Sequence, residues 1–502
     1  MTAARARDRT TPEEPVPASQ PDVLPVPDAS TVPRPDRAPT VLQFGGGNFL
    51  RAFADQMIQR ADDAGVLAAG VVVVHATPGP DTAVELLRRQ DGIYHVLLEG
   101  VRDGEPVREV TRVTAVRGVV RAHEEFEAYR DAYLDPGLRV VLSNTTEAGI
   151  AWVPDDDLAA TPPRSFPAKM TALLLDRFRH FDGDPGAGLH VVCCELIEDN
   201  ASTLRRYVLR HAAANGLPPE FVAWVEEACT FHDTLVDRIV PGYPRDEIAE
   251  IQAEIGFADQ LVVKGELYGT WVIGGDRAIR DALPLDRAGL PVEFVADVRP
   301  TRDRKVRVLN GMHTAMTPLG LLLGCTTVRE VTARPDVGRY LDLLLDREVL
   351  PSLPGDPAAL RRYAATIRER FTNPYLQHRL GDIALNSLAK FRARNLPVLL
   401  AAWSAGREAP ATALALAALL VLGAGRSGPA GFEPADDPAL LRHLRETFDP
   451  EDLVGWVRGV AVAAEYLAGD DPRLDRLAGE VAGHAGVLLR EGAGAALARL
   501  TR

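Results

Sequence analysis

Three consecutive glycines, Gly45–Gly47, constrain the fold of this chain more than any other feature. Before them, Thr40–Phe44 is a short apolar run that reads as a strand. After them, Phe49, Phe53 and Met57 recur at helical spacing. Strand, glycine turn and helix form the opening of a dinucleotide-binding unit, in which the backbone approaches a pyrophosphate and the helix N-terminus offers free N–H groups.

The glycine turn alone also suits a simple tight turn, because Leu50 stands where the full G-x-G-x-x-G fingerprint has its third glycine. The strands that follow favour the nucleotide reading. Gly70–His75 is a continuous β-branched run without alternation, which is typical of a strand buried on both faces of a parallel sheet. Leu138–Ser143 and Leu189–Cys193 are similar, and helical patterns over Phe126–Tyr133 and Ala168–Phe181 lie between these runs. The alternation predicts an α/β fold with an open sheet.

The second half of the chain has a different character. From about Phe257 the pattern becomes mainly helical, and strand-like runs are scarce after Val298. We therefore expect a disordered proline-rich tail over residues 1–37, a Rossmann-type nucleotide-binding domain over 38–258 and a mostly α-helical substrate domain over 259–502. The apolar run Pro410–Ala424 is shorter than the ~20 residues that span a bilayer, so it predicts a buried helix.

Composition excludes several classes of protein. A chain of 502 residues calls for more than one core, and a formal net charge of −14 disfavours partners such as nucleic acid and anionic membranes. The four cysteines form no CxxC pair, which predicts neither a zinc module nor a disulfide framework and favours a reducing, cytoplasmic compartment. The expected cofactor is a nicotinamide dinucleotide, and the ribose-binding position leaves NAD and NADP open, because the second strand ends His75-Ala76-Thr77 and the first acid is Asp81.

The most informative stretch is Lys305–His313, which sets Lys305, Asn310 and His313 on one predicted helix that Pro318 is expected to end. A desolvated lysine can act as general acid or base at the oxygen of a ketone that receives hydride. The asparagine amide can stabilise the charge that grows on that oxygen, and the histidine can orient it. The alternative is structural: a surface lysine, a capping asparagine and a core histidine.

These residues carry a resemblance to a known family. The spacing Lys305-x4-Asn310-x2-His313 and the loop Phe44–Arg51 resemble the catalytic and nucleotide signatures of the long-chain mannitol dehydrogenase family. Within it, the chain is similar from about residue 40 onward to the branch of tagaturonate reductases, or altronate oxidoreductases. Eight further motifs carry this similarity: Gln43–Phe53, Ser143–Gly149, Cys194–Ile197, Leu235–Val240, Gly242–Glu247, Asn373–Tyr375, Ile383–Asn386 and Lys390–Arg392.

The resemblance implies an NAD-dependent oxidoreductase of hexuronate breakdown, which interconverts the keto-uronate tagaturonate and the aldonate altronate without a metal. It implies that Lys305 is the general acid/base and that Asn310 and His313 contact the reacting oxygen. It also implies that Asp237 and Lys390 line the substrate. The cofactor-binding residues it implies are Phe44, Gly45, Gly46, Gly47, Asn48, Phe49, Arg51, Asn144, Thr145 and Glu147.

Two positions depart from the mannitol-type pattern. Leu196 stands where those members carry a second oxyanion-binding asparagine, which makes Asn200 a candidate for that role, and Leu385 replaces an arginine. A uronate carboxylate needs a cation, for which Arg392 and Arg394 are candidates, with solvated surface charge as the alternative. Fructuronate reductase, mannitol 2-dehydrogenase and a non-catalytic nucleotide sensor are the rival functions, and the sequence leaves the oligomeric state open.

Overall fold

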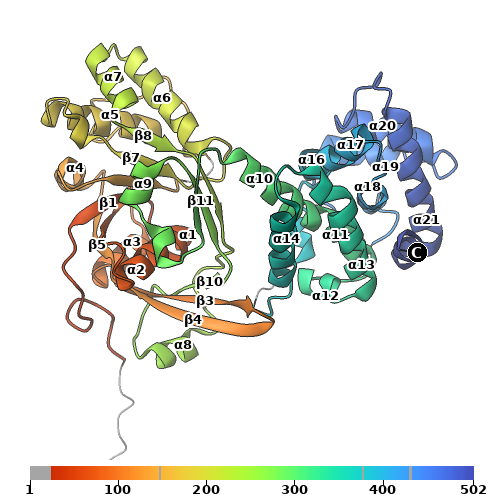
Figure 1. Ribbon diagram of the computed structural model, residues 1–502, viewed down its shortest axis with the longest axis horizontal. Coiled ribbons are helices and arrows are strands. Elements are labelled where there is room, and N and C mark those ends of the chain that lie inside the picture. The colour runs from red at the N-terminus through yellow and green to blue at the C-terminus, as the bar shows by residue number, and fades with distance from the viewer. Residues whose placement is uncertain (1–23, 146–147, 376–377, 429–431, 502) are drawn as a thin grey trace, which may run out of the picture.

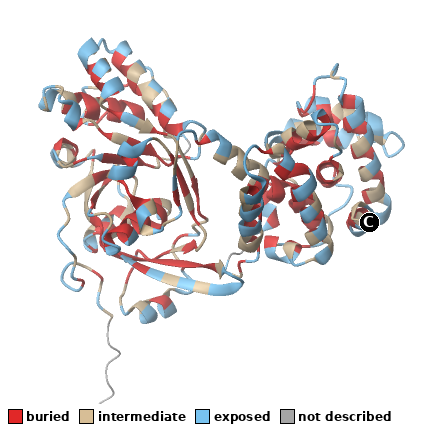
Figure 2. Cartoon of the chain, viewed as in Figure 1, coloured by how far each residue is buried: buried red, intermediate tan, exposed pale blue. Residues whose placement is uncertain are grey.

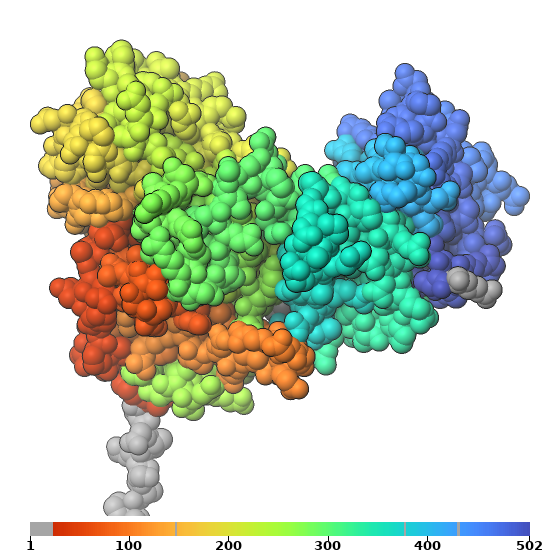
Figure 3. All heavy atoms as spheres, in the orientation of Figure 1, coloured from red at the N-terminus to blue at the C-terminus, as the bar shows by residue number. Residues whose placement is uncertain are grey.

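The computed structural model describes residues 24–145, 148–375, 378–428 and 432–501. Within these residues the chain forms an N-terminal α/β body and a C-terminal helical body, which are joined through α10 (Arg299–Lys305) (Figure 1). The space-filling view shows the two bodies meeting along a central seam below an open notch (Figure 3).

The N-terminal body is built around a parallel sheet of six strands in the order β5-β2-β1-β6-β7-β8. The chain passes from β1 to β2 on one side and later to β6 on the other, so the carboxyl ends of β1 and β6 form a topological switch point, where α/β folds bind ligands. The predicted open parallel sheet is confirmed. The strands are β1 (Pro39–Phe44), β2 (Gly70–His75), β5 (Val116–Arg121), β6 (Val140–Ser143), β7 (His190–Cys193) and β8 (Thr230–His232).

Both faces of this sheet are covered, as the continuous apolar runs predict. Along β1, Val41 packs into a core with α2 and α3, whereas Leu42 and Phe44 pack on the other face with α4 to α7. Figure 2 shows that the strands of this sheet are largely buried between the helices. The helices are α1 (Asn48–Leu50), the π-helical turn η1 (Arg51–Asp55), α2 (Gln56–Asp63), α3 (Thr82–Arg89), α4 (Phe126–Leu134), α5 (Phe166–His180), α6 (Asn200–Ala214) and α7 (Pro219–Glu227).

Two smaller sheets extend this body beyond the expected boundary at residue 258. The hairpin β3 (Tyr94–Arg102) and β4 (Glu105–Val113) pairs with β10 (Val263–Glu266), and β9 (Thr234–Asp237) pairs with β11 (Thr270–Gly274), which also pairs with β12 (Val292–Val295). Val263 and Trp271 are buried in the same core as Val41. The structure therefore places residues up to Val295 with the Rossmann-type body and not with the helical one. Helices α8 (Ile248–Ile255) and α9 (Arg277–Ala282) lie in this region.

Part of the expected disordered tail has a defined path against the α/β body. Val32 is buried, Pro25 accepts a hydrogen bond of 2.8 Å from the backbone of Ala258, and the Arg34 guanidinium donates to the carbonyl of Asp91 at 2.6 Å. Residues 24–37 therefore belong to the folded body, and residues 1–23 lie outside the described part of the chain.

The helical body surrounds one apolar helix. From Ala411 to Gly423, α18 (Pro410–Gly423) is buried, which confirms the predicted buried helix, and it packs against α11 and α21. Helix α11 continues through Pro318 to Leu322, so the prediction that this proline ends the helix is wrong; every residue from Gly311 to Leu321 is buried, and this packing stabilises the helix against the cost of the proline. The helices are η4 (Val306–Asn310), α11 (Gly311–Leu322), α12 (Val328–Thr332), α13 (Pro335–Leu343), α14 (Pro357–Phe371), α15 (Leu380–Ile383), α16 (Ser387–Arg394), α17 (Leu396–Ser404), α18, α19 (Pro438–Glu446), α20 (Leu453–Ala463) and α21 (Leu474–Leu500).

No helix in the described ranges combines the length and the apolarity needed to cross a membrane.

Candidate active site

The glycine loop lies at the switch point of the sheet. Gly45 has φ +114°, and a Cβ there would stand 3.1 Å from the carbonyl oxygen of Asn144, so the loop after β1 and the loop after β6 are in close contact. A Cβ on Gly46 would meet the side chains of Leu87 and Val73 at 3.2 Å. Gly47 is exposed and precedes the continuous helix over residues 48–63. The loop thus offers backbone N–H groups at a helix start, as a pyrophosphate site requires.

Arg51 holds the glycine loop in place from the protein interior. Its buried guanidinium donates to the carbonyls of Gly46 and Leu261 and to Oδ1 of Asn48 at 2.6 Å. These contacts lie inside the protein, so Arg51 shapes the loop and its cation is not directed outward. Phe44, another predicted cofactor contact, has its side chain in the core against Tyr129 and Phe166, and Phe49 stacks on Phe53 at 4.9 Å.

The second loop, Ser143–Thr145, is held by a carboxylate that the sequence analysis did not single out. Glu195 is buried and accepts hydrogen bonds from Ser143 Oγ at 3.0 Å and from both the backbone N–H and the Oγ1 of Thr145 at 2.9 Å. Asn144 donates from Nδ2 to the carbonyl of Cys194 at 2.9 Å. Glu147, the remaining prediction on this loop, lies outside the described residues. Glu195 directly follows Cys194 in the motif Cys194–Ile197, which was the available signal.

Lys305 lies where the helical body meets the α/β body. Its side chain is 14% exposed, and its ammonium group donates to the carbonyl of Val236 at 3.0 Å. Oδ1 of Asp237 is 3.6 Å away. Burial lowers the pKa of Lys305, an effect that the Asp237 charge partly opposes. An amine with a lowered pKa gives up its proton more readily than an ordinary lysine, which suits a group that both gives and takes a proton.

A π-helical turn separates Lys305 from Asn310. Residues five apart on an uninterrupted α-helix point about 140° away from one another, because the α-helix has 3.6 residues per turn. The wider turn η4 is hydrogen-bonded from residue i to residue i+5, so it brings Asn310 closer to the Lys305 side of the helix. The Asn310 side chain is half-buried and has no hydrogen-bond partner within the described ranges. Such π turns occur frequently at functional sites.

His313 follows in α11 and has an unused ring nitrogen. Its ring packs between Phe371 and His378, at centroid distances of 4.6 Å and 4.9 Å. Its Nε2 is buried without a hydrogen-bond partner in the described part of the chain. Burial holds the pKa of His313 well below its usual range, and the charges of His378 and Arg370 act in the same direction. The imidazole is therefore neutral and has a free polar atom for a ligand.

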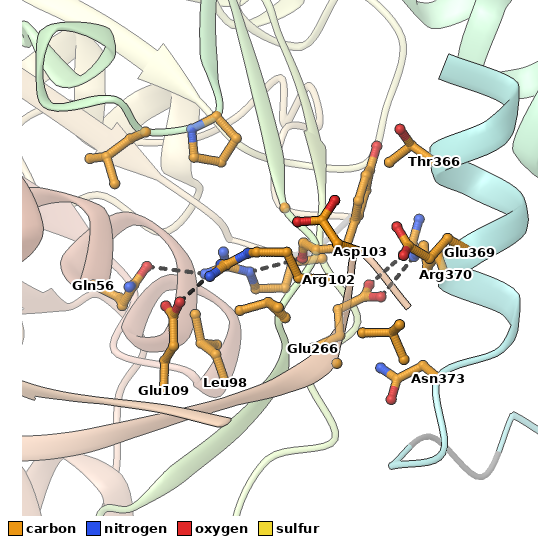
Figure 4. A pocket seen from close by; sticks show the side chains of 18 of the residues that line it. Gln56, Leu98, Arg102, Asp103, Glu109, Glu266, Thr366, Glu369, Arg370 and Asn373 are labelled. Atoms are coloured by element: carbon orange, nitrogen blue, oxygen red, sulfur yellow. Dashed lines mark hydrogen bonds and ion pairs between the residues drawn. The ribbon is translucent and has the colours of Figure 1, made fainter. Parts of the chain in front are cut away.

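Arg370, on α14, joins this centre although the sequence analysis did not identify it. It contacts both oxygens of Asp237 at 3.0 Å and 3.2 Å, and it also pairs with Glu266 through Nε at 2.7 Å. Figure 4 shows Arg370 reaching from α14 to Glu266, beside a cavity of about 490 Å³ between the β3–β4 hairpin and α14. The centre thus combines a lysine, an asparagine and a histidine with a buried ion-pair network across the two bodies.

The predicted substrate-binding cations divide into two groups. Lys390 donates to the carbonyl of Ile383 at 3.0 Å and Arg394 donates to Thr314 Oγ1 at 3.1 Å, and neither pairs with a carboxylate of the described residues. Burial lowers the pKa of both side chains, and their charges reach His313. Arg392 is exposed instead and pairs with Glu465 at the surface. On a helix, residues two apart point to nearly opposite sides, whereas residues four apart share a face.

Asn200 is a structural residue in this fold. Its Nδ2 donates to the carbonyls of Cys193 and Glu195, both at 3.0 Å, and its Oδ1 accepts from the backbone of Ala201 and Thr234. All the hydrogen-bonding capacity of this buried amide is used internally, so the prediction that it supplies a second oxyanion donor is not supported. The described residues contain no group of three or more His, Cys, Asp and Glu side chains arranged to hold a metal ion.

Comparisons with known proteins identify the family of this chain. A model of the mannitol dehydrogenase Rossmann domain matches residues 39–286, and a model of the mannitol dehydrogenase C-terminal domain matches residues 297–446. Altronate oxidoreductase of Bacillus subtilis (strain 168) is 41% identical over 413 residues, which cover 82% of this chain and 84% of that protein. The chain belongs to the mannitol dehydrogenase family. Altronate oxidoreductase of Yersinia pestis is 37% identical over 465 residues, covering 91% of this chain and 96% of that protein.

Solved structures show the same fold. D-sorbitol dehydrogenase in substrate-free form superposes with a TM-score of 0.78 at 23% identity and covers 95% of this chain and 98% of its own. Pseudomonas fluorescens mannitol 2-dehydrogenase, solved as a ternary complex with NAD and D-mannitol, superposes with a TM-score of 0.66 at 23% identity and covers 93% and 94%. The predicted family and α/β fold are confirmed. As a member of the mannitol dehydrogenase family, the chain is a nicotinamide-dependent oxidoreductase acting on a CH–OH group of a polyol or sugar acid.

Proposed function

We propose that this mannitol dehydrogenase family enzyme interconverts D-tagaturonate and D-altronate with NAD and without a metal, with Lys305 as the general acid/base. The observation that carries the proposal is a Lys305 amine only 14% exposed, on the same continuous helical stretch as the half-buried Asn310 and the unpartnered Nε2 of His313. Support for the sugar comes from relatives named altronate oxidoreductase, which are 36% to 41% identical over most of their length.

The three side chains of the helix have distinct roles at the reacting oxygen. The glycine loop Gly45–Gly47 would hold the pyrophosphate of the nicotinamide cofactor, which would supply or accept the hydride when bound. In reduction, the Lys305 ammonium gives a proton to the carbonyl oxygen, while the Asn310 amide and the neutral His313 ring hydrogen-bond to that oxygen as charge develops. In oxidation, the neutral Lys305 amine removes the hydroxyl proton. The burial that lowers the pKa of Lys305 brings its two protonation states closer in population near neutral pH.

NAD is favoured over NADP by the residues that follow β2. The segment Ala76–Pro80 has no lysine or arginine, and Asp81 caps α3 with its carboxylate 3.8 Å from the ring of His75. A 2′-phosphate is normally accommodated by a nearby arginine. Two of the arginines of the neighbouring α3 and β5, Arg88 and Arg121, are each paired with a glutamate.

The carboxylate of a keto-uronate is proposed to bind Lys390 and Arg394. Both are partly buried cations on one face of α16, and neither has an acidic partner in the described ranges. A charge-assisted hydrogen bond from either cation is worth about 1.5–3 kcal/mol, or roughly a tenfold or greater effect on substrate affinity. A neutral ketose such as fructose has no carboxylate to pair with these cations, so it gains less from them.

A substrate panel tests the proposal. Purified enzyme is assayed with NADH and with NADPH against tagaturonate, fructuronate and fructose, and kcat/KM is measured for each pair. Tagaturonate with NADH is expected to give the largest value. Turnover of fructose without tagaturonate would identify a mannitol 2-dehydrogenase, a preference for fructuronate would identify a fructuronate reductase, and no turnover at all would favour a non-catalytic nucleotide sensor.

Three variants separate carboxylate binding from general damage. Lys390→Met and Arg394→Met are expected to raise KM for the keto-uronate at least about tenfold. Arg392→Met is the matched control, because it removes the same charge from α16 at a surface position paired with Glu465. An equal loss in Arg392→Met, or no loss in the other two variants, would contradict the assignment.

A further inference from the structure

We propose that Arg370 is a positioning residue of the catalytic centre: it reaches from the helical body, binds Asp237 and Glu266 of the α/β body, and holds the Asp237 carboxylate so that its ion pair with Lys305, at 3.6 Å, stays longer than a hydrogen bond. The inference rests on the proposed role of Lys305. It assigns a task to a residue that lies outside the lysine–asparagine–histidine signature.

The guanidinium of Arg370 is almost fully enclosed by its partners. Its side chain is 5% exposed, and those of Asp237 and Glu266 are 10% and 0% exposed. It contacts both oxygens of Asp237, at 3.0 Å and 3.2 Å, and both oxygens of Glu266. The ring of Tyr268 lies beneath it, 4.4 Å from the guanidinium carbon. Figure 4 shows the contact between Arg370 of α14 and Glu266 at the end of β10.

The contact with Arg370 leaves Asp237 only partly available to Lys305. The distance from Lys305 Nζ to Asp237 Oδ1 is 3.6 Å, beyond the range of about 2.7–3.2 Å for an N–H···O hydrogen bond. Lys305 donates to the carbonyl of Val236 instead, at 3.0 Å. A guanidinium that binds both oxygens of a carboxylate fixes its orientation and offsets its charge. Arg370 therefore weakens the attraction that would otherwise hold Lys305 as an ammonium ion.

The charges around Lys305 determine in which direction Arg370 shifts the pKa of Lys305. Asp237 and Glu266 face it from β9 and β10, and Arg370 faces it from α14. Tyr268 and Tyr363 border the same network as neutral phenols, and Arg304 lies over the ring of Tyr363 at 4.6 Å. Without the Arg370 charge, two buried carboxylates remain close to Lys305, which favours its protonated form.

The ion pairs of Arg370 also make the surroundings of Lys305 depend on how the helical body packs against the α/β body. Arg370 belongs to the helical body, whereas both of its carboxylates belong to the α/β body. Next to it on α14, Glu369 accepts a hydrogen bond of 3.0 Å from the tip of the β3–β4 hairpin, and Asn373 donates to the carbonyl of Glu99 at 3.2 Å. The ion-pair network at Lys305 is complete only when α14 is docked in this position.

The test measures the pH dependence of sugar-acid oxidation in the full-length enzyme. Oxidation needs the neutral Lys305 amine, so kcat/KM rises with pH as the amine loses its proton. Arg370→Ala is expected to move this rise upward by about one pH unit or more, with Arg370→Lys in between. At a pH below the rise, a shift of one unit lowers the rate about tenfold. Glu266→Gln removes a negative charge in nearly the same shape, so it is expected to move the rise downward.

Two controls separate this role from structural damage. Arg368→Ala removes an arginine from the same helix that pairs with Asp342 within the helical body, and it is expected to leave the pH profile unchanged. Added guanidinium ion is expected to restore part of the Arg370→Ala profile. A loss of kcat without any shift of the profile in Arg370→Ala, together with an unshifted Glu266→Gln, would overturn the inference.

A second readout does not depend on turnover. The pH dependence of Lys305 acetylation by a trace amine-reactive reagent, followed by mass spectrometry, reports the titration of this amine directly. Unchanged titration in Arg370→Ala would refute the positioning role whichever sugar the enzyme uses. Failure of the substrate panel, with the titration shifted as expected, would instead refute only the proposed function.

Discussion

Replacing Lys305 gives the sharpest test of the catalytic centre. Lys305→Ala and Lys305→Met both remove the amine, and the second keeps most of the side-chain volume. General acid–base catalysis typically contributes about 10²–10⁴ in rate, or about 3–5 kcal/mol in the barrier, so kcat is expected to fall by that factor in both variants. Cofactor affinity is expected to persist, because the glycine loop is built by β1 and the helix over residues 48–63, not by the helix that carries Lys305.

The structure also predicts what this substitution does to folding. Losing the hydrogen bond to the carbonyl of Val236 costs about 1 kcal/mol. Removing a largely buried cation relieves its desolvation, which opposes the cost of the lost hydrogen bond, and Asp237 keeps its partner Arg370. The unfolding temperature of Lys305→Met is therefore expected to stay close to that of the unmodified enzyme.

The assay combines steady-state kinetics with cofactor titration. The kcat for sugar-acid oxidation is measured across pH, and NADH binding is followed by fluorescence. In the unmodified enzyme the rate should rise with pH, and half of the rise should come below the ordinary lysine pKa, because burial lowers the pKa of Lys305. In Lys305→Met this rise should be absent. Near-normal kcat, or a pH profile that keeps its rise, would refute the role of Lys305.

Three further variants test the supports of the site. Gly45→Ala places a Cβ against a backbone oxygen at φ +114°, so a cost of about 1–3 kcal/mol and a raised KM for NADH are expected, with kcat less affected. Glu195→Ala removes the carboxylate that holds the loop after β6, which should weaken NADH binding in a direct titration. Asn200→Ala leaves buried polar groups without partners and should lower the free energy of unfolding by about 1–3 kcal/mol in urea titrations; a selective loss of kcat would instead restore Asn200 as a substrate contact.

The parts of the fold that depend on short local patterns could be predicted from the sequence. The strand–glycine–helix unit at Gly45–Gly47 and the β-branched run Gly70–His75 are each read from a few neighbouring residues, and both form the expected elements. The strands β10, β11 and β12 are only four or five residues long and lie in a mainly helical stretch. β10 pairs with β3 and β11 pairs with β9, in both cases across an intervening stretch of other elements, and β12 pairs with β11, so no local periodicity indicates these sheets.

The candidate site divides in the same way. Lys305, Asn310 and His313 share one helix and one spacing pattern, whereas Arg370 comes from a different helix and joins them only through the tertiary fold. The π turn η4 has no composition signal, so the closer approach of Asn310 to the Lys305 side could not be predicted. Glu195 lies in the motif Cys194–Ile197, but it holds the loop at Thr145, and this contact between two separate segments depends on the tertiary fold.

The division among the cations of α16 follows from helix geometry and bears on substrate choice. Lys390 and Arg394 are four residues apart and face the active-site side, whereas Arg392, between them, is exposed and paired with Glu465. The charges of Lys390 and Arg394 both help to lower the pKa of His313, so both cations lie near this ring. Neither cation forms an ion pair with a carboxylate among the described residues. The charge of Asp436 acts on Lys390, but neither cation is directly paired with a carboxylate, so a bound anion would stabilise both. A sugar acid supplies that anion and a neutral polyol does not, so the charge arrangement itself favours a uronate or aldonate as the substrate.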